Sequence, residues 1–318
     1  MAPRVQSKGN ELEWFNWRNP VLHRRFGSIM TAPTMAGPQR KPYDDEIDVY
    51  GITHQGRVRK DNQDHFLICS LKRQIVVRQT SLPNIDGVTR ESDRLAFLMM
   101  VADGVGGGVK GEEASRMAVE AATQYVQRSM RCYYATRAQD DEEFFEALKE
   151  AALGCHGELM RRGQKDPEYR GMATTLTLYL GVWPCAYLLQ VGDSRCYVLE
   201  QGQLTQITRD QTMAQELVDL GVMKPADAKS SRLGHTLSSA IGGRNTEPVV
   251  TQRNPNWGNV VLLCSDGLTQ HVSDDRIRER LLTMKSSRQV CEDLLDDALA
   301  DGGTDNITLI VGRALPGN

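Results

Sequence analysis

Four aspartates stand where apolar, strand-like segments of this 318-residue chain begin or end. Asp103, Asp193 and Asp266 each follow such a segment, and Asp305 precedes one. A carboxylate at the end of a buried strand loses hydration unless it is paired or binds a cation. If these strand ends meet at one edge of the sheets, they form the oxygen-rich cluster that Mg²⁺ and Mn²⁺ prefer. A single such Asp is more often a turn or cap residue, so the prediction depends on the four together.

The stretch around the first of them, MMVADGVGGGVKGEEAS (residues 99–115), places five glycines within eight residues. A glycine-rich turn between a strand and a helix is a common phosphate cradle, which makes nucleotide binding the first alternative. A P-loop closes with a Lys-Ser/Thr pair, whereas here Glu112 and Glu113 stand at the expected helix start and would repel a triphosphate. The second interpretation is that Asp103 is a metal ligand and that the glycines let the carbonyl of Gly104 approach the same ion.

Hydrophobic periodicity predicts one domain from Tyr43 onward, without an internal repeat or a linker. Strands are expected at 47–53, 66–77, 95–101, 174–182, 186–191, 196–199, 260–264 and 307–311, and helices at 112–133, 142–162, 273–284 and 288–300. Because the strands come in adjacent clusters and the helices in pairs, we expect mainly antiparallel sheets with helices packed outside them. The Asp-Gly pair at 86–87 predicts the turn of an extra hairpin.

The composition, 40% apolar and 25% charged, is that of an ordinary globular protein. No segment reaches the ~18 apolar residues of a membrane span, and the N-terminus lacks the apolar core of a secretory signal. We therefore expect a cytoplasmic protein without an integral membrane segment. The seven cysteines are scattered without a CxxC pair, which favours reduced thiols over disulfides or a zinc site.

The net charge of −3 is unevenly divided, because residues 1–42 carry +5 and the remainder −8. An acidic body is a poor nucleic-acid binder, so no nucleic-acid partner is expected. Residues 1–42 contain five prolines and no sustained period, which predicts a flexible basic N-terminal arm. Its aromatic cluster at 14–17 and the pair Arg24-Arg25 could dock onto a membrane surface or a partner. A tail that lies on its own domain or is disordered is the interpretation we favour.

Six segments of the chain, in this order, resemble the ordered motifs of the metal-dependent type-2C serine/threonine protein phosphatases in their bacterial form. They are GRVRKDNQD (56–64), VADGVGGGVKGEEAS (101–115), GMATT (171–175), VGDSRCYVL (191–199), LLCSDGLT (262–269) and GGTDNITLIV (302–311). Six motifs in the right order are far more specific than any one of them. The match runs from about Tyr43 to Gly312, so the basic arm and the hairpin near Asp86 lie outside it.

The resemblance implies an α+β fold, a four-layer α-β-β-α sandwich of two mainly antiparallel sheets flanked by helices, in a catalytic domain of residues 43–318. It also implies a binuclear Mg²⁺ or Mn²⁺ centre at one end of the sheets. The resemblance implies that Asp103 bridges the two ions. It implies the carbonyl of Gly104 as a ligand of one ion, and Asp266 and Asp305 as ligands of the other. Asp193 is implied to help Asp266 to hold a third, looser ion.

The resemblance assigns further roles around this centre. Arg59 is implied as the phosphate-binding arginine, since its planar five-donor fork suits two phosphoryl oxygens better than an ammonium would. Gln63, Asp64 and Asn306 are expected to support the metal ligands from behind. The segment 211–232 resembles the mobile flap beside the cleft.

The implied activity is hydrolysis of phosphoserine or phosphothreonine on proteins, without a covalent intermediate. Two ions about 3.5–4 Å apart can share a water molecule, lower its pKa and direct it at phosphorus. Phosphate-monoester hydrolysis is among the slowest uncatalysed reactions, so this electrostatic help must supply most of the acceleration. Phosphoproteins are the expected partners, with a serine/threonine kinase among them by analogy with the family and a role in signal transduction.

The chain departs from the family pattern at two positions. Many members have Glu where Gln63 stands, so the second ion here is expected to rely more on Asp103 and water, with Asp64 acting from behind. Some members carry His directly after the Asp-Gly pair, as a proton donor to the leaving group, whereas this chain has Val105. No side chain is therefore assigned as the general acid.

The sequence also offers two rival functions. Cys155 and Arg161 have the Cys-x5-Arg spacing of cysteine-dependent phosphatases, but the cysteine belongs to an apolar helical stripe and no phosphate-cradling loop separates the two residues. A buried core thiol is the favoured interpretation. The alternative from another class is a catalytically weak phosphatase-fold binding or signalling module. Retention of Asp103, Asp266 and Asp305 together with Arg59 weighs against it.

Overall fold

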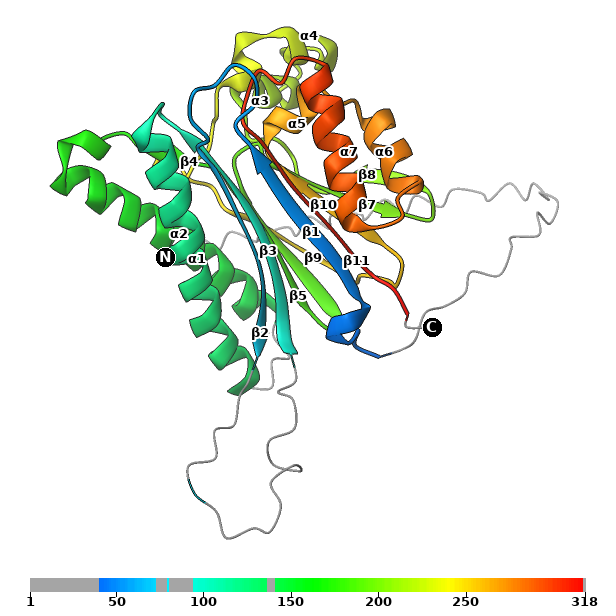
Figure 1. The fold of residues 1–318 in the computed structure, drawn as a ribbon. Coiled ribbons are helices and arrows are strands. Elements are labelled where there is room, and N and C mark those ends of the chain that lie inside the picture. Colours follow the sequence, from blue (N-terminus) through cyan, green and yellow to red (C-terminus); the bar gives the residue numbers. More distant parts are fainter. Residues whose placement is uncertain (1–39, 73–78, 80–93, 136–140, 317–318) are drawn as a thin grey trace, which may run out of the picture. The chain divides into compact units, whose positions relative to one another are not determined.

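Two antiparallel β-sheets pack face to face in the computed structural model, which describes residues 40–72, 79, 94–135 and 141–316 (Figure 1). The first sheet contains, in spatial order, β1 (Ile47–His54), β11 (Ile307–Ala314), β10 (Val260–Cys264), β7 (Arg195–Glu200) and β8 (Gln203–Gln206). The second contains β2 (Asp64–Lys72), β3 (Arg94–Val105), β5 (Leu176–Val182), β6 (Cys185–Val191) and β9 (Val249–Arg253), with β4 (Ala173–Thr174) beside β3.

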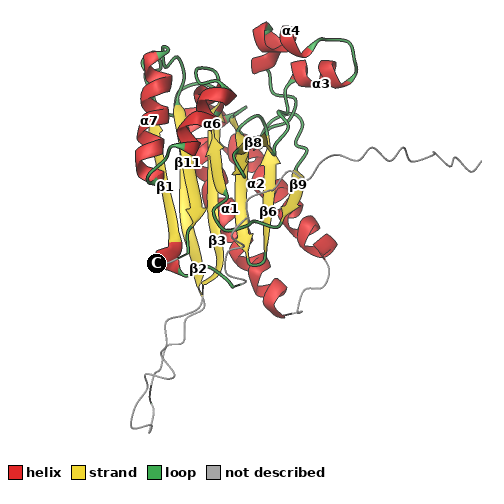
Figure 2. Cartoon of the chain, turned by 90° about the vertical axis from the view of Figure 1, so that its right-hand side faces the viewer, coloured by secondary structure: helices red, strands yellow, loops and turns green. Residues whose placement is uncertain are grey.

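Helices cover the outer face of each sheet (Figures 1 and 2). On the second sheet lie α1 (Val109–Ala135) and α2 (Asp141–Lys165), and on the first lie α5 (Asp266–Thr269), α6 (Asp274–Leu282) and α7 (Ser287–Ala300). Beyond one end of the sheets stand α3 (Met213–Asp219) and α4 (Pro225–Ser230). The described residues also include three short 3₁₀ turns: η1 (Asp44–Glu46), η2 (Pro167–Tyr169) and η3 (Arg232–His235). This arrangement confirms the predicted α+β class and the four-layer α-β-β-α sandwich.

Three apolar layers hold the sandwich together, and β3 shows how the sequence builds two of them. Its residues Leu98 and Met100 pack under α1 and α2, whereas Met99 and Val101 pack between the sheets. Alternate side chains of a strand point to opposite faces, so a strand covered on both faces is apolar at every position. The third layer lies between the first sheet and α5–α7.

The four long predicted helices are present, and serine caps set the starts of two of them. The Ser273 hydroxyl accepts from the amide of Arg276 at the start of α6, and Ser286 accepts from Gln289 at the start of α7. Capping of this kind satisfies amides that have no partner inside the helix. The prediction of a helix from Ser273 was therefore one residue early, because Ser273 is the cap.

Several boundaries differ from the predictions for physical reasons. The strand expected at 95–101 continues through Asp103 to Val105, because Gly104 and Val105 pair with β4. Two edge strands, β8 and β9, were not predicted, since their sequences QLTQ and VVTQR lack a fully buried face. The four-residue α5 was also missed, as it is too short to show a helical period. The 73–77 part of one predicted strand and the Asp-Gly hairpin at 86–87 lie outside the described residues.

Of the predicted arm, residues 1–42, only 40–42 belong to the described residues, so its conformation stays a prediction. Arg40 forms an ion pair with Glu46 (2.5 Å), and its guanidinium lies over the ring of Tyr43. None of the helices in the described ranges is both long and apolar enough to cross a membrane.

Candidate metal centre

Strand pairing brings the predicted aspartates to one end of the two sheets (Figure 1). In the second sheet Asp103 of β3 lies directly opposite Asp64, the first residue of β2. In the first sheet β10 ends where its antiparallel neighbour β11 begins, so Asp266 and Asp305 stand on adjacent strand ends. Asp193 follows β6, whose last residue pairs with the first residue of β5. Each of these acidic side chains therefore comes from a different strand end.

Two threonines fix the backbone of Asp103. Its amide donates to the Thr175 hydroxyl (2.9 Å), and its carbonyl oxygen accepts from the Thr174 hydroxyl (2.8 Å) and the Thr175 amide (2.9 Å). The Thr175 hydroxyl is also hydrogen-bonded to the hydroxyl of Ser194 (2.7 Å), next to Asp193. The GMATT segment thus positions Asp103 and links it to the loop that carries Asp193.

The carboxylates perturb one another strongly. The pKa of Asp103 is raised well above its usual range, first by burial and then by the negative charges of Asp64, Asp266, Asp193 and Asp305. Burial and then the charge of Asp266 likewise raise the pKa of Asp193, and burial and then Asp305 raise that of Asp266. Carboxylates that disfavour one another's ionised form are stabilised as anions by a cation.

Asp64, opposite Asp103, is a buried acid with one unsatisfied oxygen. Its side-chain Oδ2 accepts from the Ser265 hydroxyl (2.8 Å), whereas Oδ1 is buried without a hydrogen-bond partner among the described residues. Burial raises the pKa of Asp64 to about 7. Buried polar atoms almost always have a partner, so an orphaned carboxylate oxygen here indicates a missing donor or cation.

Arg59 stands at the mouth of the cluster on the loop between β1 and β2. Its Nη2 donates to Asp305 Oδ2 (2.6 Å), and the side chain is 55% exposed. The hydrogen bond to Asp305, and then the charges of Asp305, Asp103 and Asp266, raise the pKa of the guanidinium. The guanidinium is thus held beside the carboxylates with much of its surface open to solvent.

The loop that carries Arg59 is held by Asn306. The Asn306 Oδ1 accepts from the Gln63 amide (2.9 Å), and its Nδ2 donates to the carbonyls of Gln55 and Asp61 (2.9 Å each). Asn306 is buried at the start of β11, directly after Asp305. One side chain therefore ties the loop that carries Arg59 to an acidic strand end.

Glycine is required at residue 104 by close packing. A Cβ there would lie 2.1 Å from the carbonyl oxygen of Gly111. The side-chain amide of Gln63, oriented so that both of its ends have partners, donates to the Gly104 carbonyl (3.0 Å) and accepts from the Gly108 amide (2.7 Å). Gln63 therefore contacts the same carbonyl that the sequence resemblance assigns to a metal ion.

The donor set fits hard divalent cations. Within the described ranges no three Asp, Glu, His or Cys side chains converge closely enough to enclose an ion as they stand. Three carboxylates instead accept from protein donors: Asp305 from Arg59, Asp266 from Gln270 (2.6 Å) and Asp64 from Ser265. All candidate ligands are oxygens, the five acids outnumber the nearby arginines Arg59 and Arg195, and one buried carboxylate oxygen has no hydrogen-bond partner among the described residues. Mg²⁺ and Mn²⁺ favour ligands of this kind.

Several supporting residues were not identified from the sequence. Thr174 and Ser265 stand in motifs but are ordinary in type, so nothing marked their hydrogen bonds to Asp103 and Asp64. Gln270 reaches Asp266 because it is the C-cap of α5, four residues after Asp266 and still in helical conformation. That i, i+4 spacing would have predicted the contact if the short helix had been expected.

The rival nucleophile is excluded by its surroundings. Cys155 lies on α2, is fully buried, and directs its thiol at the carbonyl of Ala118 (3.9 Å). Burial raises the pKa of this thiol to about 12, so it is not a thiolate at neutral pH. The prediction of a core cysteine is confirmed.

The fold and this site define a class: a four-layer α-β-β-α protein with an acidic centre suited to divalent cations and an arginine at its mouth. Residues 76–301 match the profile of the protein phosphatase 2C family, and the chain belongs to this family. The resemblance seen in the motifs is thereby confirmed.

Known relatives extend the comparison. The chain is 35% identical over 219 residues to the serine/threonine protein phosphatase PstP of Mycobacterium tuberculosis, an alignment that covers 68% of this chain and 40% of PstP. It is 27% identical over 260 residues to the serine/threonine phosphatase stp of Listeria monocytogenes, covering 81% of this chain and 92% of stp. A crystal structure of the PstP catalytic domain in complex with two manganese ions superimposes with a TM-score of 0.65 at 29% identity, over 85% of this chain and 99% of that one.

Proposed function

We propose that this protein is a metal-dependent serine/threonine protein phosphatase that uses Mn²⁺ or Mg²⁺. The observation that carries the proposal is the cluster of Asp103, Asp266 and Asp305 with the half-exposed guanidinium of Arg59 at its mouth. The names of the relatives and the two manganese ions bound to PstP support it. The substrates are then phosphoserine and phosphothreonine side chains of other proteins, which a serine/threonine kinase would supply as part of a signalling pathway.

In this proposal Asp103 would contact both ions of a pair, the Gly104 carbonyl would be a further ligand of one, and Asp266 and Asp305 would be ligands of the other. Asp193 would help Asp266 to hold a third ion. When bound, a pair of divalent cations supplies a water molecule of lowered pKa as nucleophile and neutralises charge on the phosphoryl oxygens.

The chain's own residues bind and orient the substrate. Arg59 binds phosphoryl oxygens through its planar fork, and its hydrogen bond to Asp305 keeps that fork beside the acidic cluster. Asn306 keeps the Arg59 loop in place, and the Thr174–Thr175 pair does the same for Asp103. Rigid supports of this kind matter because small displacements of reacting groups are costly to the rate.

The test is hydrolysis of p-nitrophenyl phosphate and of a phosphothreonine peptide by the purified full chain. Activity should require added Mn²⁺ or Mg²⁺ and should disappear in excess EDTA. Full activity in EDTA would refute a metal-dependent mechanism. Absence of turnover with Mn²⁺ on both substrates would favour the binding-module alternative.

A further inference from the structure

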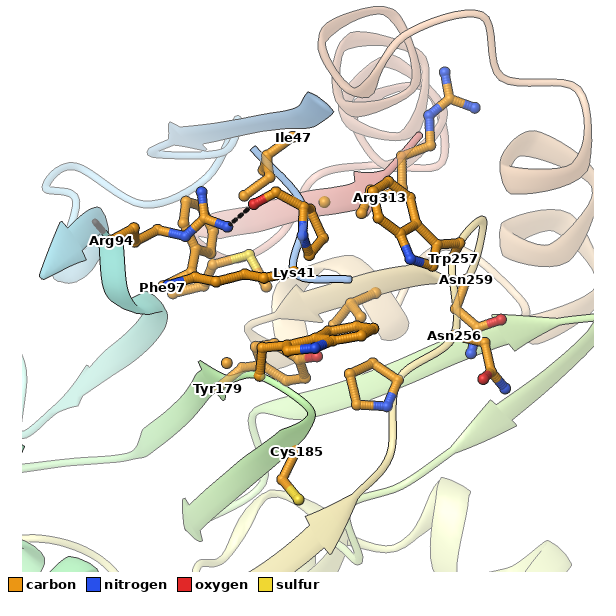
Figure 3. A pocket seen from close by; sticks show the side chains of 18 residues that line it. Lys41, Ile47, Arg94, Phe97, Tyr179, Cys185, Asn256, Trp257, Asn259 and Arg313 are labelled. Carbon is orange, nitrogen blue, oxygen red and sulfur yellow. Dashed lines mark hydrogen bonds between the residues drawn. The ribbon is translucent and has the colours of Figure 1, made fainter. Parts of the chain in front are cut away.

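The cavity between the two sheets is separate from the candidate metal centre (Figure 3). It encloses about 120 Å³, and Phe97 in its wall lies six residues along β3 from Asp103, a span of about 20 Å. Figure 3 shows Arg94 of its lining donating to the Pro42 carbonyl (2.6 Å). None of the candidate metal ligands is among its lining residues, so the residues that support that centre are found at the other end of the sheets.

At that end, His271 stands between the segments that carry two of the candidate ligands. Asp266 is the first residue of α5, and His271 follows it by five residues, with its amide donating to the Leu268 carbonyl (3.1 Å). Asp305 lies in the connection from α7 to β11, shortly after Asp301, the C-cap of α7. The His271 side chain is only 8% exposed.

Both ring nitrogens of His271 contact the connection before β11. Nε2 accepts from the Thr304 amide (2.9 Å), and Nδ1 lies 3.2 Å from Asp301 Oδ2. A backbone amide can only donate, so Nε2 is the acceptor and Nδ1 carries the ring proton, which it donates to the Asp301 carboxylate. The imidazole therefore joins the end of α7 to the residue before Asp305.

The same side chains have the connectivity of a nucleophile, a base and an orienting acid, because the Thr304 hydroxyl also lies 2.9 Å from His271 Nε2. A base needs its lone pair for the proton of the hydroxyl. Nε2 has one lone pair in the plane of the ring, and the Thr304 amide already donates to it. The arrangement therefore suits a residue that holds the backbone rather than one that activates a nucleophile.

The turn that leads into Asp305 also contacts the loop that carries Arg59. The Gly303 carbonyl accepts from the Arg57 amide (2.7 Å), and Asp305 Oδ2 accepts from Arg59 Nη2 (2.6 Å). A shift of this turn would therefore move a candidate ligand and Arg59 together. His271 holds the turn from the segment after α5.

We infer that His271 is a positioning residue of the metal centre, which holds Thr304 so that Asp305 stays beside Asp266. The inference rests on the proposed function, in which these two carboxylates are ligands of the same ion. Residues behind metal ligands typically change metal affinity 10–100-fold when they are replaced. Loss of the contact with Thr304 should therefore weaken the ion of Asp266 and Asp305 and spare the ion of Gly104.

The test is calorimetric titration of Mn²⁺ into the full chain with His271→Asn or His271→Gln. The glutamine oxygen reaches about as far as Nε2 and can accept from the Thr304 amide, whereas asparagine reaches only as far as Nδ1 and keeps the contact with Asp301. His271→Asn should weaken one of the two main ions about tenfold and leave the other within about twofold, whereas His271→Gln should stay within about twofold of the wild-type affinity for both.

Thr304→Val is the matched control, because it removes the hydroxyl and keeps the amide and the shape of the side chain. Its Mn²⁺ affinities should equal those of the wild-type protein, and a loss as large as that of His271→Asn would overturn the assignment of the amide as the contact. Equal affinities of the asparagine and glutamine variants would overturn the inference alone. A wild-type protein that binds no Mn²⁺ would refute the proposed function as well.

Nitrogen NMR of the wild-type imidazole tests the contact without a substitution, and so decides the question if His271→Asn does not fold. At about pH 8 the ring proton of His271 should be on Nδ1, and a proton on Nε2 would overturn the inference. This measurement requires neither metal nor turnover, so its result is independent of whether the protein is a phosphatase.

Discussion

Replacing Asn306 with alanine should release the loop that carries Arg59. The Asn306 amide makes three hydrogen bonds of 2.9 Å, with the backbone of Gln63, Gln55 and Asp61. A hydrogen bond of this kind contributes about 1 kcal/mol net, and bonds that share one side chain are not fully additive. We therefore expect a loss of about 2–3 kcal/mol in the free energy of unfolding, which is a fall of about 3–5 °C in Tm for a domain of this size.

Differential scanning calorimetry measures the Tm, and hydrogen exchange of the Gln63 amide reports on the loop itself. Asn256→Ala is the matched control, because the exposed Asn256 side chain donates to Glu200 (2.9 Å) at the surface. Its Tm should change by no more than the equivalent of about 0.5 kcal/mol. The reasoning is refuted if the two variants shift the Tm equally, or if exchange of the Gln63 amide is unchanged in Asn306→Ala.

Three further substitutions test separate parts of the structure. Asp297→Asn removes a carboxylate whose pKa is lowered to about 2, first by its hydrogen bond to Arg280 and also by one to Arg276. Because the pKa of Asp297 is lower in the folded protein than in the unfolded chain, its carboxylate stabilises the fold above about pH 3.8, and this contribution fades as the pH falls toward 2. Urea denaturation of Asp297→Asn should therefore show a loss of about 1 kcal/mol in the free energy of unfolding at pH 7 and a smaller loss at pH 3. A loss of equal size at both pH values would contradict this. Arg59→Ala should raise the KM for a phosphothreonine peptide at least tenfold with the Tm nearly unchanged, and an unaltered KM would remove it from phosphate binding. Cys155→Ser should leave turnover unchanged, whereas loss of turnover in a folded variant would reopen the covalent route.

Most of the fold could be predicted from the sequence because its central strands are buried on both faces. The runs at 95–101 and 260–264 are apolar at nearly every position, and β3 and β10 are found there. The edge strands β8 and β9 escaped prediction since solvent covers part of them and their sequences alternate weakly. Pairing of Gly104 with β4 also depends on residues seventy positions away, which local periodicity does not report.

The acidic residues of the candidate site could be predicted because four of them stand at ends of apolar strands, whereas a single such Asp would have indicated only a turn or a cap. Asn306 was expected as a supporting residue from the resemblance alone, whereas Thr174 and Thr175 were not, since they are common types whose importance comes from a partner distant in sequence. The orphaned oxygen of Asp64 and the contact of Gln63 with the Gly104 carbonyl likewise depend on three-dimensional packing.

Calorimetric titration of Mn²⁺ into the wild-type protein and into Asp103→Asn tests the proposed metal centre most directly. Asp103 is the acid whose pKa responds to all four of its neighbours, and in the proposal it alone contacts both ions of the pair. The wild-type protein should bind two ions in the main sites, and Asp103→Asn should weaken both together with the fold retained by circular dichroism. Two sites of undiminished affinity in a folded Asp103→Asn protein would contradict the bridging role.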